Sequence, residues 1–189
     1  MLKKIVEGRW LTANAVVALY PANSVDEDDI AFYTDESRTE RALTWYGLRQ
    51  QTEKQVVDGV QMPSRCLADF VAPRHAMHSG ATQVDSTRAG GQNGLNVLDY
   101  AGLFAVTAGI GADKRAQAFE VAHDDYSAIL LKSLADRLAE AFAEVLHQRV
   151  RTDLWGYASQ ESLECNDLIA ERYQGIRPAP GYPACPDHS

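Results

Sequence analysis

The sequence predicts an α+β fold, a single domain in which long helices pack against a mostly antiparallel, twisted sheet. Short apolar runs separated by turn residues occupy the first part of the chain. From Asp113 onward, apolar residues instead recur at steps of three and four, the period of an amphipathic helix. With 189 residues, 46% of them hydrophobic and 23% charged, the chain is large enough for one domain with its own core.

Four segments have the composition of β-strands. The first is the apolar run at residues 15–20, which we expect to form a buried strand that ends at the turn residues 21–24. Residues 29–35 follow closely, and these two segments are expected to pair as antiparallel neighbours. Residues 65–73 and 100–109 are the other strand candidates.

Helix signals lie between and after these strands. Ser37 and Glu40 have the spacing of a capping box, which predicts a helix over residues 38–54. A last helix is expected at residues 166–174, because Gly175 and the proline beyond it form a helix-stop signal.

The longest helical pattern begins at Asp113. Four polar residues, Asp136, Glu140, Glu144 and His147, fall beside its apolar stripe or on the opposite side. An apolar stripe of this kind indicates that one helical face packs on a core. The stripe comprises Phe119, Ala122, Tyr126, Ile129, Leu130, Leu134, Leu138, Phe142, Val145 and Leu146.

Composition excludes several classes of protein. The formal net charge of −8 argues against sequence-independent binding to nucleic acid, whose phosphates attract basic surfaces. No stretch approaches the roughly 20 apolar residues of a membrane span. Three widely spaced cysteines, Cys66, Cys165 and Cys185, do not suggest a disulfide framework and favour a reducing compartment. We therefore expect a cytoplasmic protein that binds neither nucleic acid nor membranes.

Metal binding has little support in the sequence. Residues 74–99 are rich in Gly, Ser, Thr and Asn and are expected to form a long loop. His75 and His78 in this loop could supply half of a metal site, but no nearby residue completes one. Cys185 and His188 have a spacing that could suit zinc, which would need further ligands. We expect no bound metal.

The C-terminal sequence GIRPAPGYPACPDHS is the most distinctive part of the chain. Proline fixes φ and lacks a backbone donor, so RPAPGYP should run extended rather than join a sheet or helix. Arg177 offers a planar fork for a carboxylate, Gly181 permits close approach of a ligand, and Tyr182 adds an aromatic face with a hydroxyl. These features suit a small zwitterion with an organic body. The alternative is a proline-rich strap that only covers the core.

Several long stretches carry a family resemblance: RQQTEK, CLADFVAP, HDDYSAILLKSLADRLAEAFAEVLHQRV, LWGYA and YQGIRPAPGYPACPDH. They closely resemble the C-terminal activation domain of cobalamin-dependent methionine synthase, from about Trp10 to His188. The resemblance implies that residues 1–189 form one such domain. It also implies that this domain is incomplete at both ends, because the family's domain begins earlier and continues further.

The resemblance implies a role in enzyme reactivation. Methionine synthase moves a methyl group from methyltetrahydrofolate to homocysteine through cobalamin, which is occasionally oxidised to inactive cob(II)alamin. The family's activation domain binds S-adenosylmethionine and caps the cobalamin-binding domain. Flavodoxin or a flavoprotein reductase supplies an electron, and methyl transfer from the sulfonium traps the reduced cobalt. This chain would then be part of a methyltransferase without being catalytic alone, and its partner domain would carry the cobalamin.

The resemblance also implies site residues. Arg177 matches the arginine that holds the methionine carboxylate, and Glu171 matches a second acidic residue near the ligand. Tyr182 matches a tyrosine that reaches the cobalt face, and Glu140 matches a helical glutamate that acts beside it through water, so these two are the expected catalytic residues. By their pattern alone, Glu140 and Glu171 would be solvated helix residues. The segment expected to line the amino-acid end of the ligand comprises Pro178, Ala179, Pro180, Gly181 and Tyr182.

Differences from the family leave an alternative open. The sequence has no cobalamin-binding D-x-H-x-x-G motif and lacks the barrel domains that bind homocysteine and folate. Flanking segments that contact the ligand in the family are also missing, and the loop at residues 74–99 is longer than usual. The alternative is a non-catalytic docking or structural domain that keeps the fold but has lost S-adenosylmethionine binding.

Overall fold

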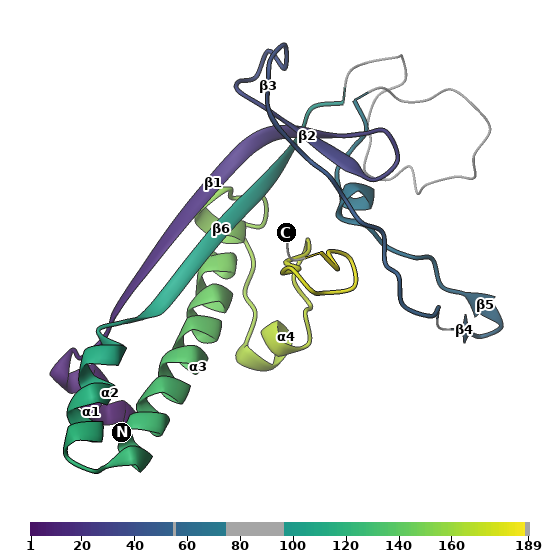
Figure 1. Cartoon of the computed structure of the whole chain (residues 1–189). Coiled ribbons are helices and arrows are strands. Elements are labelled where there is room, and N and C mark those ends of the chain that lie inside the picture. Colours follow the sequence, from purple (N-terminus) through teal and green to yellow (C-terminus); the bar gives the residue numbers. More distant parts are fainter. Residues whose placement is uncertain (55, 75–96, 188–189) are drawn as a thin grey trace. The chain divides into compact units, whose positions relative to one another are not determined.

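The computed structural model describes residues 1–54, 56–74 and 97–187 (Figure 1). Backbone contacts divide the chain into two compact units. Unit 1 comprises Met1–Ala18 and Leu103–Arg177, and unit 2 comprises Leu19–Gly102 and Pro178–Ser189. Most of the loop predicted at residues 74–99 lies outside the described residues, so it stays a prediction.

A four-stranded sheet with the order β3-β2-β1-β6 contributes to both units. Figure 1 shows the two long strands β1 and β6 side by side. β2 pairs antiparallel with β1 on one side and with β3 on the other, and Ala22 lies opposite Phe32. The α+β class is therefore confirmed, and so are the strands predicted at residues 29–35 and 100–109. The strands are β1 (Thr12–Val25), β2 (Asp29–Tyr33), β3 (Arg41–Trp45) and β6 (Asp99–Ile110).

β1 is longer than predicted, and its buried residues lie after the run at residues 15–20 that is predicted to be buried. The turn predicted at residues 21–24 is wrong, because pairing with β2 begins at Ala22 and continues to Val25. Pairing with a neighbouring strand thus overrides the local turn preference. The run at residues 15–20 is partly or fully exposed, and Val16 is 70% exposed.

The helix predicted over residues 38–54 is wrong. Ser37 does not cap a helix; its backbone N–H donates to Asp35 Oδ1 at 2.8 Å, which closes a tight turn. Arg38 then adopts the left-handed conformation with φ 53°. The chain continues into β3, whose pairing with β2 satisfies backbone groups that a helix would have bonded internally.

The strand predicted at residues 65–73 is also wrong, because this segment contains a short 3-10 helix. The backbone N–H of Cys66 donates to Asp69 Oδ2 at 2.9 Å, and the backbone N–H of Asp69 donates to the Cys66 carbonyl at 3.1 Å. This reciprocal pair closes the turn locally. The elements of this region are β4 (Val56–Val57), β5 (Val60–Gln61) and the 3-10 helix η1 (Leu67–Phe70).

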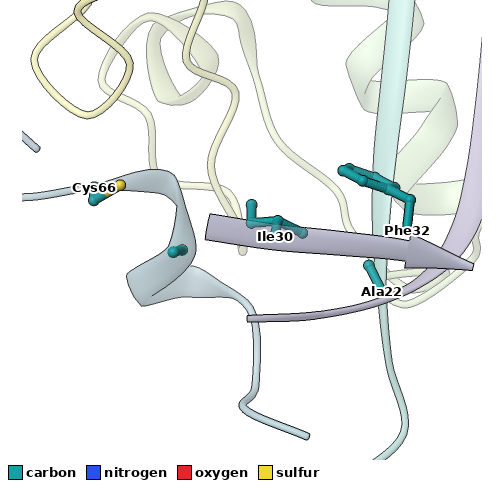
Figure 2. Packing of buried hydrophobic residues seen from close by; sticks show 5 residues of the cluster. Ala22, Ile30, Phe32 and Cys66 are labelled. Atoms are coloured by element: carbon teal, nitrogen blue, oxygen red, sulfur yellow. The ribbon is translucent and has the colours of Figure 1, made fainter. Parts of the chain in front are cut away.

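The apolar core of unit 2 joins β1, β2 and η1. Ile30 and Phe32 lie two residues apart on β2 and so project from the same face of that strand. Figure 2 shows them with Ala22 on the neighbouring strand and Cys66 beside η1. The buried members of this cluster are Ala22, Ile30, Phe32, Cys66 and Ala68.

A polar cluster is buried next to this core. Asn23 is fully buried, and its Nδ2 donates to the carbonyls of Ala72 at 3.0 Å and Val97 at 2.9 Å. Its Oδ1 accepts a 2.9 Å hydrogen bond from Nη1 of Arg38, which is only 4% exposed. Arg38 Nη2 donates to the Asp99 carbonyl at 2.8 Å. Asn23 and Arg38 therefore tie together four segments that are distant in the sequence.

Unit 1 contains the α-helices of the described residues. The helical region predicted from Asp113 is confirmed, but it forms two helices that are separated at His123, which has φ 57°. Asp124 begins the second helix, because its side chain accepts a hydrogen bond from the backbone N–H of Ser127 at 3.0 Å. The elements are α1 (Leu2–Gly8), α2 (Ala112–Val121), α3 (Asp125–Arg149), the π-helical turn η2 (Val150–Leu154) and α4 (Cys165–Ile169).

The helix predicted over residues 166–174 is shorter than expected. α4 ends at Ile169 because Glu171 adopts the left-handed conformation with φ 52°. The backbone N–H of Arg172 then donates to the Asp167 carbonyl at 3.0 Å, a hydrogen bond typical of a helix C-terminus. The stop signal at Gly175 therefore does not end this helix.

The apolar core of unit 1 joins α1, α2 and α3. Small residues allow α2 and α3 to approach each other closely. Four exposed members of the predicted stripe lie outside this core. They are Ala122, Tyr126 (76% exposed), Ile129 (66%) and Val145 (59%). Within the described residues, no helix is both long and apolar enough to cross a membrane. The buried members of the core are Ile5, Ala116, Ala128 and Leu131.

We predict that Asn23→Ala destabilises the chain by about 2–4 kcal/mol, because it leaves a buried guanidinium donor and two carbonyls without their partner. Urea denaturation followed by circular dichroism measures this free energy. Asn14→Ala, at an exposed position of the same strand, should change it by less than about 0.5 kcal/mol. Equal stability of both variants would contradict a structural role for the polar cluster.

Candidate functional site

One side of α3 carries polar residues towards its C-terminal end. Glu144, His147 and Arg151 are separated by three and four residues, so they follow one side of α3 and of the adjoining turn η2. The segment that follows η2 returns to this side of the helix and supplies partners for all three. The resulting contacts lie within unit 1.

Arg151 is the centre of this cluster. Its side chain is fully buried, and it forms a bidentate ion pair with Glu161, through Nε to Oε2 at 2.8 Å and Nη2 to Oε1 at 2.7 Å. The guanidinium also lies over the ring of Tyr173, 4.2 Å from the ring centroid. A buried charge is tolerated when its donors have partners, and here Glu161 engages two of the three guanidinium nitrogens while the third, Nη1, contacts His147.

His147 is held in its neutral form by the same cluster. Arg151 Nη1 lies 2.7 Å from His147 Nδ1, and since a guanidinium can only donate, Nδ1 accepts and the ring proton resides on Nε2. Burial, followed by the positive charges of Arg151 and Arg177, lowers the pKa of His147 to about 4. The imidazole ring meets the Tyr173 ring edge to face, with centroids 4.8 Å apart.

The segment that leads to Arg177 is anchored on both sides of Gly175. Tyr173 contacts His147 and Arg151, and the hydroxyl of Tyr157 donates to the Gln174 carbonyl at 3.2 Å. Gly175 has φ 94°, and a Cβ at this position would approach the Tyr157 hydroxyl to 2.8 Å. Glycine is therefore required for this bend, which directs the chain towards Arg177.

Arg177, the predicted carboxylate-binding residue, pairs with Glu144. Its Nη2 donates to Glu144 Oε2 at 2.7 Å, and the two side chains remain 26% and 29% exposed. In the described part of the chain, Arg177 Nε and Glu144 Oε1 are buried and have no hydrogen-bond partner. The ion pair thus uses only part of the bonding capacity of each group.

The two predicted acidic residues lie near the ends of this cluster. Glu140 is exposed on α3, one turn before Glu144. Glu171 is exposed in the left-handed position after α4, two residues before Tyr173. Arg177 thus pairs with the helix that carries Glu140, and within the described residues neither acid forms a hydrogen bond or an ion pair with its guanidinium.

The last predicted residues belong to unit 2 and form a turn. The backbone N–H of Tyr182 donates to the Ala179 carbonyl at 3.1 Å, and that of Gly181, at φ 90°, donates to the Cys185 carbonyl at 2.8 Å. The expected extended course therefore ends at Pro180. Tyr182 is 60% exposed, so its hydroxyl is available to a partner.

Sequence patterns do not single out Arg151, Glu161 or Tyr173, and they place His147 beside the apolar stripe of the helix or on its opposite side. The spacing of the helical members is visible in the sequence, but their partners come from an irregular segment without a periodic pattern. The available signal is the spacing of His147 and Arg151, which lie four residues apart and therefore on the same side of a helix. Within the described residues, no group of three or more His, Cys, Asp or Glu side chains could hold a metal ion.

Two comparisons with known proteins bear on this site. The model of the family described as vitamin B12 dependent methionine synthase, activation domain, matches residues 1–189. Among solved structures, the chain is similar to the MetH reactivation domain bound to AdoHcy, with 50% sequence identity and a TM-score of 0.78. The match covers 100% of this chain and 50% of that chain, so this chain spans half of its length.

The lowered pKa of His147 predicts a pH-dependent stability. As the pH falls, the unfolded chain binds a proton near pH 6.5, whereas the folded chain does so only near pH 4. The contribution of His147 is therefore complete above about pH 6.5 and is lost as the pH falls towards 4, by on the order of 3 kcal/mol. We expect His147→Gln to lose less unfolding free energy than the unaltered chain when the pH is lowered from 7 to 4.5. Urea denaturation at the two pH values measures this difference.

The matched control is His123→Asn, which lies outside the cluster at an exposed position. This variant should keep the pH dependence of the unaltered chain. The same loss of stability on acidification in His147→Gln and in the unaltered chain would show that the buried imidazole is not its source.

Proposed function

Because the chain belongs to the family of vitamin B12 dependent methionine synthase activation domains, we propose that it binds S-adenosylmethionine and serves as the reactivation module of that enzyme. In this role, the bound sulfonium supplies the methyl group for reductive methylation of cob(II)alamin on a partner domain. The solved MetH reactivation domain, 50% identical in sequence, is bound to AdoHcy, the product that remains when S-adenosylmethionine has lost its methyl group.

The observation that carries this proposal is the position of Arg177. Its guanidinium is half-buried, and Tyr173, Gln174 and Gly175 hold the backbone that precedes it. A guanidinium in such an environment binds a carboxylate through charge-assisted hydrogen bonds that water screens less than at an open surface. We assign the carboxylate of the amino-acid end of the ligand to Arg177.

The remaining assignments follow the family resemblance. We propose that the backbone of residues 178–182, which follows Arg177 directly, contributes contacts to the ligand, with Glu171 nearby. Tyr182 and Glu140 would act on the cobalt side of the transferred methyl group. The exposure of Tyr182 and Glu140 supports this role, because a residue that acts on a cofactor carried by another domain must be accessible to it.

The proposed partners are the cobalamin-binding domain of methionine synthase and an electron donor, flavodoxin or a flavoprotein reductase. Membership in the methionine synthase family supports the first partner. The alternative remains a docking or structural domain that has lost the ligand. Co-purification with the cobalamin-binding domain, combined with no ligand binding at millimolar concentration, would favour this alternative.

We expect Arg177→Ala to weaken S-adenosylmethionine binding by about 2–3 kcal/mol, or roughly 30- to 140-fold, because a charge-assisted contact to the carboxylate is lost. Isothermal titration calorimetry measures the dissociation constant. The matched control is Arg172→Ala, since the Arg172 side chain is 70% exposed and forms a surface ion pair with Asp167.

The control variant should bind within about twofold of the unaltered chain. An unchanged dissociation constant for Arg177→Ala would remove this residue from the ligand site. Absence of binding by the unaltered chain, even at millimolar ligand, would contradict the proposed function.

A further inference from the structure

Glu144 contacts Arg177, the residue proposed to bind the ligand carboxylate. The family resemblance assigns no role to Glu144. It lies on α3, and its Oε2 accepts the 2.7 Å hydrogen bond from Arg177 Nη2. Its other oxygen, Oε1, is buried without a hydrogen-bond partner among the described residues. Burying an unpaired acceptor of a charged group is costly, so an atom of this kind indicates a missing partner.

The same ion pair contains an unused donor. Arg177 Nε is also buried without a partner in the part of the chain that the structure describes. The pair therefore presents one unused anionic acceptor and one unused cationic donor on adjoining side chains. A ligand that matches both unused atoms carries a cationic group and an anionic group close together. The ammonium and carboxylate of an α-amino acid, which are attached to the same carbon, meet this requirement.

Two neighbouring side chains are already engaged by Arg151. His147 Nδ1 is occupied by Arg151, and its Nε2 carries the ring proton. Both oxygens of Glu161 accept hydrogen bonds from Arg151. In this part of unit 1, Glu144 thus combines a negative charge, partial burial and an unused oxygen.

We infer that Glu144 binds the α-ammonium of the ligand while Arg177 binds its carboxylate, which makes Glu144 a specificity-determining residue for a zwitterionic amino-acid end. This inference rests on the proposed function. It requires the side chains of Glu144 and Arg177 to separate enough to admit the ligand. Their partial exposure on the surface of unit 1 is consistent with such a movement.

The test compares the affinities of the unaltered chain and of Glu144→Gln for two ligands, one with the α-ammonium and one without it. The two probes are AdoHcy and the adenosyl thioether that carries a butanoate in place of the amino acid. We expect the unaltered chain to prefer AdoHcy. We expect Glu144→Gln to bind AdoHcy about 10- to 100-fold more weakly, and to bind the butanoate as well as the unaltered chain or better.

Two further variants serve as controls. Asp136→Asn removes the same charge from an exposed position of α3 and should leave both affinities unchanged. Glu144→Asp keeps the negative charge and should recover part of the preference for AdoHcy. Thermal unfolding of each variant separates a loss of binding from a loss of the fold.

Three results would overturn the inference, and only one of them would also contradict the proposed function. Equal weakening of both probes by Glu144→Gln would mean that Glu144 only orients Arg177. Tighter binding of both probes would mean that Glu144 merely competes with the ligand carboxylate. In either case the proposed function stands. Failure of the unaltered chain to bind AdoHcy at all would overturn the proposed function and the inference together.

Discussion

The buried ion pair between Arg151 and Glu161 is the interaction on which the candidate site depends. It joins the end of α3 to the irregular segment that follows, and its guanidinium also supports the ring of Tyr173. Because arginine does not lose its proton in proteins, the only way to accommodate it in this interior is to keep the carboxylate beside it. The path of the chain from η2 to Arg177 therefore depends on this ion pair, and α4 contributes no buried residue to it.

The charges of this cluster are balanced. Two guanidiniums, Arg151 and Arg177, face two carboxylates, Glu144 and Glu161, and the imidazole of His147 lies between them without a charge. The zwitterionic amino-acid end of a ligand adds no net charge to such an environment, whereas a lone carboxylate or a lone ammonium would leave one group uncompensated. Keeping the histidine neutral also prevents a third positive charge from competing for the two carboxylates.

Sequence patterns predicted the features that depend on local periodicity. The helical region that contains α2 and α3 and the strands β2 and β6 belong to this class, and the terminal Arg177 was singled out by its proline-rich context. The helix predicted over residues 38–54 failed because pairing with β2 competes with the helical preference of this segment. The partner of Arg177 could not be predicted, because Glu144 lies 33 positions earlier in the sequence and the intervening chain includes an irregular segment whose course is set by Arg151.

The three thiols of the chain differ in chemical availability. Cys66 and Cys185 are buried, and burial raises the pKa of both thiols, so little of either is present as the reactive thiolate at neutral pH. Cys165 is exposed at the first residue of α4, in the segment that ends at Arg177. The native chain thus offers a single accessible attachment point for a maleimide dye or a spin label. A reporter there could follow rearrangement of this segment in real time without any engineered cysteine.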